Sequence, residues 1–189
     1  MRISKSAVHI GIKNLERQGF LKIAPRHGTY VADYHEFGNT DTPVALLRYR
    51  GNTLDKKTIK SILQFREGKE GMAMKLLAQK HTDEDIAALE KYIQQISLTT
   101  PEDTDTLSRL LFEYHLCIGI RSGNNAIPMV MNAFHDISII FWNSWLEKTN
   151  VTEVVCFLKQ YTACIASGDS QAALAFYRRY TGDFLNTLD

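Results

Sequence analysis

The sequence is poor in the residues that build covalent cross-links and membrane spans. It has three cysteines, four prolines and two tryptophans in 189 residues. An odd cysteine count without a C-x-x-C pair does not fit a disulfide framework. No uncharged apolar run approaches the ~20 residues of a transmembrane helix, and the N-terminus lacks the apolar core of a secretion signal. We therefore expect a cytoplasmic protein without membrane association, whose cysteines are reduced and buried: Cys117, Cys156 and Cys164.

Charge is distributed unevenly along the chain. Residues 1–31 hold six lysines and arginines against one acidic residue, a net charge of +5, whereas the remainder holds 16 basic and 20 acidic residues, a net charge of −4. This asymmetry favours a polyanion-binding surface in the first thirty residues, although short segments also fluctuate in charge by chance. With 44% apolar residues, the chain can bury one full domain and a smaller one.

Residues 5–18 are predicted to form an amphipathic helix that Ser4 or Ser6 can cap. Its apolar residues share one face: Val8, Ile12 and Leu15. Three potential hydrogen-bond donors recur every fourth residue on another face: Lys5, His9 and Lys13. A helix docked in the DNA major groove needs such polar residues in front of an apolar anchor. A solvated helix face with a few lysines would look similar.

A β-hairpin is predicted to follow this helix. Gly19 ends the helix, and residues 20–24 and 29–31 have strand character on either side of a turn with Arg26 and His27 at its tip. Helix, strand, basic turn and strand is the order of a winged helix, in which such a tip reaches phosphates or the minor groove. The alternative is an ordinary hairpin that covers a helix.

The run ISKSAVHIGIKNLERQGFLKIAPRHGTYVADY, residues 3–34, resembles the recognition helix and wing of GntR-type transcription regulators. The resemblance implies DNA contacts from both elements: Ser4, Lys5, Ser6, His9, Arg26, His27 and Thr29. The row of donors on the helix adds Lys13 to this set. Lys5 and His9 stand where arginine is frequent, and neither offers the guanidinium fork.

The two helices that precede the recognition helix in the GntR family have no counterpart in these 189 residues. Because those helices complete the hydrophobic core of the DNA-binding domain, we expect weak or no specific DNA binding by this chain alone. The alternative is a ligand-binding and dimerisation module without independent DNA binding.

The chain as a whole is predicted to be mainly α. A partial winged helix over residues 1–34, with a recognition helix and a hairpin wing, precedes a linker over 35–53 and an all-α antiparallel bundle of about six helices over 54–189. The bundle helices are expected at 54–79, from a capping box at Thr82 to Asp85, from an N-cap at Thr100 with Pro101 in first position, at 127–146, at 150–166 and from 170 to about 185.

The bundle resembles the FCD domain, the effector domain of the FadR branch of the GntR family. Several features match in order along the chain: Arg66 with Glu70, Tyr114-His115, Ser122-Gly123-Asn124, Ala166-Ser167-Gly168-Asp169 with Ala172-Ala173, and Arg178-Arg179-Tyr180. The resemblance implies a homodimer that binds operator DNA and responds to a small molecule. We expect effector contacts at four polar residues: Arg66, Tyr114, His115 and Tyr180. Each of these could instead be a satisfied core residue.

Many FCD domains bind a divalent metal through one aspartate and three histidines. Only His115 is kept here, because the other three positions hold Leu111, Leu158 and Tyr180. One ligand cannot hold zinc or nickel, so we predict no metal and no other cofactor. The more apolar pocket is similar to that of fatty-acid-responsive members, so the effector is expected to be an acyl-CoA or an organic acid.

An enzyme is the main alternative class. The sequence contains no nucleophile motif and no glycine-rich phosphate loop, and its remaining histidines are isolated: His35, His81 and His135. We therefore expect a protein without catalytic activity.

Overall fold

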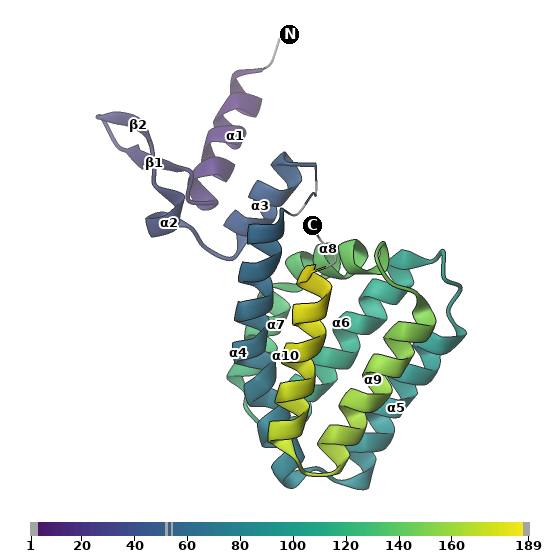
Figure 1. Ribbon diagram of the computed structural model, residues 1–189. Coiled ribbons are helices and arrows are strands. Elements are labelled where there is room, and N and C mark those ends of the chain that lie inside the picture. Colours follow the sequence, from purple (N-terminus) through teal and green to yellow (C-terminus); the bar gives the residue numbers. More distant parts are fainter. Residues whose placement is uncertain (1–3, 52, 54, 187–189) are drawn as a thin grey trace. The chain divides into compact units, whose positions relative to one another are not determined.

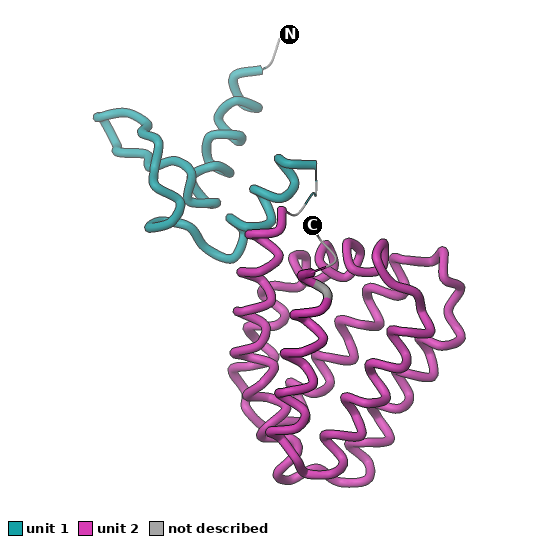
Figure 2. The backbone as a smooth tube through the Cα atoms, in the orientation of Figure 1, with its two compact units in different colours: residues 1–53 teal, residues 54–189 magenta. Residues whose placement is uncertain are grey.

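The computed structural model describes residues 4–51, 53 and 55–186, except for the side chain of Phe184. The chain divides into two compact units, residues 1–53 and 54–189 (Figure 2). Leu54, where the sequence places the first bundle helix, lies outside the described residues. Each unit is described by itself below.

The first unit consists of a helix, a hairpin and two short helices (Figure 1). Helix α1 (Lys5–Arg17) is capped by Ser4, whose Oγ accepts a hydrogen bond from the backbone N–H of Ala7. It ends as predicted at Gly19, whose φ of +78° is left-handed. Strands β1 (Leu21–Ala24) and β2 (Gly28–Val31) pair antiparallel, with Ala24 opposite Gly28. The predicted order of a helix followed by a β-hairpin is confirmed.

Two helices occupy most of the segment that we expected to be a linker, α2 (Tyr34–Phe37) and α3 (Asp41–Tyr49). They are tied to the end of α1. The side-chain amide of Asn39 donates to the carbonyl of Arg17 over 2.6 Å, and the hydroxyl of Thr42 donates to the carbonyl of Gln18 over 2.7 Å. These bonds satisfy carbonyl groups that a helix C-terminus leaves unpaired.

The second unit is helical throughout the described part of residues 54–189 (Figure 1). Its helices are α4 (Lys56–Lys80), α5 (Asp83–Leu98), α6 (Thr104–Arg121), α7 (Ala126–Ala133), α8 (His135–Leu146), α9 (Val151–Ala166) and α10 (Ser170–Asn186). Helix α6 packs against α4, α5, α7 and α8, and α10 lies along α4 and α9. No described helix is long and apolar enough to cross a bilayer.

Two predicted helix starts are confirmed by their capping bonds. Thr82 and Asp85 exchange the two hydrogen bonds of a capping box, and the side chain of Asn150 accepts from the backbone N–H of Glu153. The predicted start at Thr100 and Pro101 is wrong. Helix α6 begins at Thr104, because the carboxylate of Asp103 accepts from the backbone N–H of Thr106 and forms the cap.

Other local features of the second unit differ from the predictions. The single helix expected over 127–146 is broken at Phe134 into α7 and α8. On α4, Met72 is 55% exposed, whereas Ala73 and Met74 are buried. Of the three cysteines expected to be buried, Cys117 is buried, Cys164 is half-buried and Cys156 is exposed.

Candidate functional site

The donors predicted on α1 are all exposed. Lys5, His9 and Lys13 lie along the outer surface of the helix, as does Ser6. Two of the predicted residues also have structural bonds, since Ser4 caps the helix and Lys13 forms a 3.0 Å ion pair with Glu16. An exposed pair of this kind is weak, so Lys13 can exchange it for a phosphate at little cost. The helix therefore offers a row of polar side chains to a partner.

The hairpin tip also presents cationic and polar groups. Arg26, His27 and Thr29 are exposed, and Arg26 has a φ of +68° in the turn between the strands. The tip is held in shape by the hydroxyl of Tyr30, which donates to the carbonyl of His27 over 2.9 Å. The same unit thus carries the two basic features that the sequence predicts.

A side chain of α1 joins the helix to the hairpin. Glu16 Oε1 accepts a 3.0 Å hydrogen bond from the backbone N–H of Ile23 in β1. This bond and the ion pair to Lys13 lower the pKa of the Glu16 carboxyl. The apolar face behind the donors is only partly covered by described residues, because Val8 is 48% and Leu15 42% exposed. The helix is therefore positioned relative to the wing, but its apolar anchor is incomplete.

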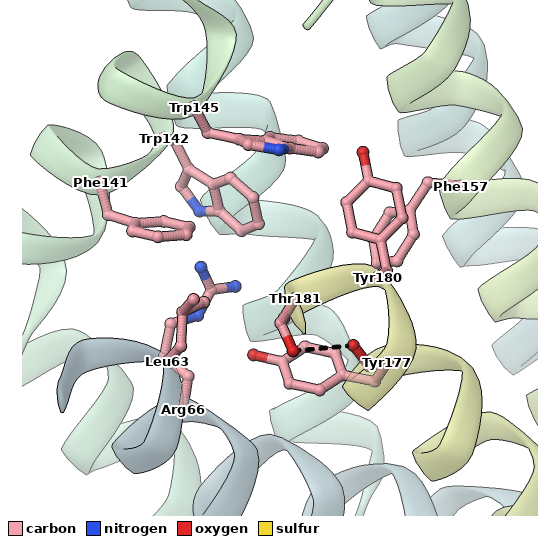
Figure 3. Close-up of a pocket in the computed structure, with 9 residues that line it drawn as sticks. All are labelled: Leu63, Arg66, Phe141, Trp142, Trp145, Phe157, Tyr177, Tyr180 and Thr181. Atoms are coloured by element: carbon pink, nitrogen blue, oxygen red, sulfur yellow. Dashed lines mark hydrogen bonds between the residues drawn. The ribbon is translucent and has the colours of Figure 1, made fainter. Parts of the chain in front are cut away.

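In the second unit, an aromatic pocket lies between α4, α8, α9 and α10 (Figure 3). The cavity itself is about 20 Å³, and the space between the side chains out to the open mouth totals about 280 Å³. In this form the cavity therefore has room for about one water molecule. Nine residues line it: Leu63, Arg66, Phe141, Trp142, Trp145, Phe157, Tyr177, Tyr180 and Thr181.

Arg66 is the charged residue of this lining. Its guanidinium carbon lies 4.0 Å from the centre of the Trp142 ring and 4.7 Å from that of Phe141. Figure 3 shows the tip of the guanidinium directed toward these rings from α4. Cation–π attraction of this kind strengthens when the cation is removed from water. Arg66, whose side chain is 4% exposed, is therefore held in a fixed position at the pocket.

Glu70 holds Arg66 from the next turn of α4. Arg66 donates from Nε to Glu70 Oε1 over 2.8 Å and from Nη2 to Oε2 over 3.2 Å. Lys69 donates from Nζ to the same Oε1 over 3.1 Å. Burial raises the pKa of Glu70, but Arg66 and Lys69 outweigh this and hold it well below its usual value. The carboxylate is therefore ionised between two cations.

His115 lies beside this charged cluster. Its Nδ1 is 3.5 Å from Glu70 Oε2, and its ring stacks on Trp142 at 5.1 Å. Neither ring nitrogen has a hydrogen-bond partner among the described residues. Burial lowers the pKa of His115 to about 3 despite the attraction of Glu70, so the imidazole is neutral at pH 7.

The four residues predicted to contact an effector therefore have different positions. Arg66 and Tyr180 line the pocket, while His115 lies against Trp142 in the charged cluster. Tyr114 shares a 2.8 Å hydrogen bond with the hydroxyl of Thr162 and is not among the pocket residues. Burial raises the pKa of Tyr180 to about 12, and that of Tyr114 still further. Both phenols are neutral at pH 7.

Most of the pocket was not identified from the sequence. The aromatic residues of α8 and α10 have the spacing of ordinary core residues, and only their convergence makes a pocket: Phe141, Trp142, Trp145 and Tyr177. Glu70 was paired with Arg66 from the sequence, one turn further along the helix, whereas Lys69 was not singled out.

Three of the four positions that bind metal in many FCD domains are apolar or phenolic here. Leu111 and Leu158 are fully buried in the core, and Tyr180 lies in the pocket lining. Among the described residues, no group of three histidines, cysteines or carboxylates is placed to hold a metal ion. The donor set does not fit such a metal, and its absence from the protein stays a prediction.

A second hollow lies on the surface between α5 and α9, with a volume of about 590 Å³. Its lining mixes both helices: Ile86, Glu90, Ile93, Gln94, Ser97, Lys159, Thr162, Ala163 and Ala166. The buried charged cluster is not part of this lining, so we take the aromatic pocket as the candidate ligand site.

Comparison with known proteins places this geometry in a family. The model of the FCD domain matches residues 61–182. The chain is 24% identical over 189 residues to the HTH-type transcriptional regulator LutR of Bacillus subtilis (strain 168), covering 95% of this chain and 83% of LutR.

Two solved structures share the fold. Streptococcus agalactiae GntR is 18% identical with a TM-score of 0.56, over 97% of this chain and 82% of that one. Lar, which controls the expression of the Listeria monocytogenes agr system, is 13% identical with a TM-score of 0.66, over 98% and 80%. With the recognition helix, the wing and the helical bundle in place, the chain belongs to the FCD-domain branch of the GntR family of transcription regulators.

Proposed function

We propose that this regulator binds operator DNA through its first unit and that a small molecule in the aromatic pocket of its second unit changes the affinity for DNA. The observation that carries the proposal is the pocket itself, a cavity with a fixed cation and aromatic walls inside the FCD domain. Ligand sites in proteins are commonly such apolar cavities with a few polar groups.

The exposed residues of α1 and the hairpin divide the DNA contacts between them. Lys5, Lys13 and Arg26 supply charge to phosphates, and Ser6, His9 and Thr29 supply further hydrogen bonds. The Oγ of Ser4 accepts the capping bond, so its hydroxyl hydrogen is left for a phosphate oxygen. His27 adds a donor at the hairpin tip. In a homodimer, two such surfaces would read the halves of a palindromic operator in the cytoplasm.

The size of the pocket favours an organic acid over an acyl-CoA as the effector. Sites for drug-sized ligands occupy about 300–1,000 Å³. The cavity here is about 20 Å³, far below that range, so only a small ligand can enter with limited movement of the rings. Arg66 supplies the positive charge that an acid requires.

Binding of DNA is tested by fluorescence anisotropy over a salt series, on an operator selected from a random-sequence library. Each phosphate contact contributes about 0.9 to the slope of log affinity against log salt. We expect Lys5→Ala and Lys13→Ala each to reduce that slope by about one. Lys91→Ala, at an exposed lysine of α5, is the matched control. Equal slopes for all three variants would contradict the proposed DNA surface.

Ligand response is tested in the same assay with a panel of small organic acids. We expect at least one acid to raise the melting temperature of the second unit and to change DNA affinity by about 5- to 150-fold, the usual range of allosteric coupling. Trp145→Ala should remove both effects together. Loss of the thermal effect without loss of the DNA effect would contradict the pocket assignment.

A second candidate is a ligand-binding and dimerisation module without independent DNA binding. The exposure of Val8 and Leu15 on the apolar face of α1 favours it. Sedimentation would then show a dimer, and the same acids would raise the melting temperature. Anisotropy would show only weak binding that does not distinguish the selected operator from scrambled DNA.

A further inference from the structure

The buried charged cluster beside the pocket is not electrically balanced. Arg66 and Lys69 are cations, and Glu70 is the anion between them, with side chains 4%, 10% and 5% exposed. His115, at 2% exposure, makes no hydrogen bond among the described residues and adds no charge. The cluster therefore carries a net charge of +1 where water is nearly excluded. Proteins seldom leave such a charge uncompensated, because its desolvation is costly.

The positive charge can be reached from the pocket through one atom, Nη1 of Arg66. Glu70 occupies Nε and Nη2 of Arg66 and the amine of Lys69, whereas Nη1 of Arg66 has no hydrogen bond to a described residue. Arg66 lines the pocket and Glu70 does not. An anionic group in the pocket would thus meet the free edge of the guanidinium without displacing Glu70. The Tyr177 ring lines the same cavity, and burial and the neighbouring Glu70 raise the pKa of its phenol, so its hydroxyl is neutral at pH 7.

The rest of the pocket has a different chemistry. Tyr180 lies 4.1 Å from the ring centre of Phe157 and 5.5 Å from that of Trp145, with the Trp145 and Tyr180 rings nearly perpendicular. These rings contact one another by stacking and edge contacts, so a flat ligand can take a place among them only after they move apart. Thr181 does not offer a free donor, because its hydroxyl bonds to the carbonyl of Tyr177 over 3.0 Å. Figure 3 shows this aromatic side facing the guanidinium across the cavity.

We propose that the pocket takes a compact aromatic monoanion, with its carboxylate on Arg66 and its ring among Trp145, Phe157 and Tyr180. One negative charge brings the cluster to neutrality. A neutral analogue leaves the excess positive charge, and a dianion buries an excess negative charge. This inference rests on the proposed function, since it names the class of effector for the same site.

The test uses isothermal titration calorimetry at pH 7 to compare benzoate with benzamide, its neutral analogue of nearly the same shape. A third probe, the dianion terephthalate, adds a second carboxylate on the opposite side of the ring. A charge-assisted hydrogen bond contributes about 1.5–3 kcal/mol, which corresponds to about 10- to 150-fold in affinity. We expect benzoate to bind more tightly than benzamide by a factor in that range, and more tightly than terephthalate. Both tryptophans of the chain line the pocket, so their fluorescence should change with each bound probe.

Lys69→Met tests the charge balance without touching the pocket lining. It leaves Arg66 and Glu70 as a neutral pair, so the preference for benzoate over benzamide should be smaller than in the wild type. Lys75→Met, at an exposed lysine of the same helix, is the matched control and should keep the wild-type preference. Circular dichroism of both variants checks that the bundle is folded.

Three results would overturn the inference. These are equal affinity of the wild type for benzoate and benzamide, an unchanged preference in folded Lys69→Met, and no saturable binding of benzoate at all. The DNA assay separates this outcome from the proposed function. If another acid changes the DNA affinity of the wild type but not that of Trp145→Ala, the regulator is ligand-responsive and only the aromatic monoanion class is wrong. If benzoate binds as expected but no pocket ligand changes DNA affinity, the proposed function fails.

Discussion

Glu70→Gln should destabilise the second unit strongly, although the two side chains have nearly the same shape. Glu70 accepts two hydrogen bonds from Arg66 and one from Lys69, all inside the protein. The amide leaves two buried cations without an anion and directs an N–H group at one of them. Removing one partner of a buried ion pair costs about 3–5 kcal/mol. For a unit the size of residues 54–189, this corresponds to about 10–20 °C in melting temperature.

The matched control is Glu67→Gln, the same substitution one turn earlier on α4. Glu67 pairs with Arg178 over 2.7 Å at the surface, where such pairs contribute at most about 1 kcal/mol. Urea unfolding followed by tryptophan fluorescence measures both variants, with an unchanged m-value as the condition for comparison. If Glu70→Gln lowers the free energy of unfolding by no more than Glu67→Gln does, the buried cluster does not stabilise the fold as argued.

The stability difference between the wild type and Glu70→Gln should decrease as the pH falls. The pKa of Glu70 is depressed in the folded state, whereas an unfolded glutamate titrates near about 4.3. The unfolded state therefore takes up the proton first as the pH falls. The stability gap between wild type and Glu70→Gln should stay constant from about pH 7 to 5 and shrink progressively below about pH 4. A gap that is still constant at about pH 2 would contradict the depressed pKa.

Two further predictions concern local geometry. Gly19→Ala should destabilise the first unit by more than about 2 kcal/mol, because a Cβ at this left-handed position would lie 2.5 Å from the carbonyl oxygen of Phe37. Gly11→Ala, at an open position in α1, should instead stabilise the unit by about 0.5–1 kcal/mol. Hydrogen exchange of the β1–β2 amides reports both, and equal protection in the two variants would contradict the close approach. Tyr114→Phe should cost about 1–2 kcal/mol in urea unfolding by leaving a buried threonine hydroxyl unpaired. Tyr49→Phe, at 91% exposure, should change stability by less than about 0.5 kcal/mol, and a similar loss in both would refute the role of the Tyr114 bond.

Local signals in the sequence located most helix ends. Thr82 with Asp85 and Asn150 with Glu153 have spacings that fix which backbone N–H each side chain reaches. The start of α6 was misplaced because Thr100 and Asp103 are both good caps, and sequence alone does not choose between them. The break at Phe134 has no glycine or proline to mark it.

The candidate pocket was only partly predictable, for a geometric reason. Arg66 and Tyr180 were identified through the family resemblance, which compares positions one at a time. The remaining walls come from helices whose aromatic residues approach one another only in the folded bundle, as Trp145 of α8 and Phe157 of α9 do at 6.2 Å. Periodicity indicates which face of a helix is buried, but not which buried faces leave a cavity.

The nearly filled cavity has a consequence for any molecule that acts there. Because it has room for about one water molecule, a ligand binds only to the fraction of proteins whose rings have already swung aside. The measured affinity is then the intrinsic affinity multiplied by that open fraction. Substitutions that favour the open arrangement, without removing one of the rings proposed to hold the ligand, would raise the measured affinity without adding a contact to the ligand.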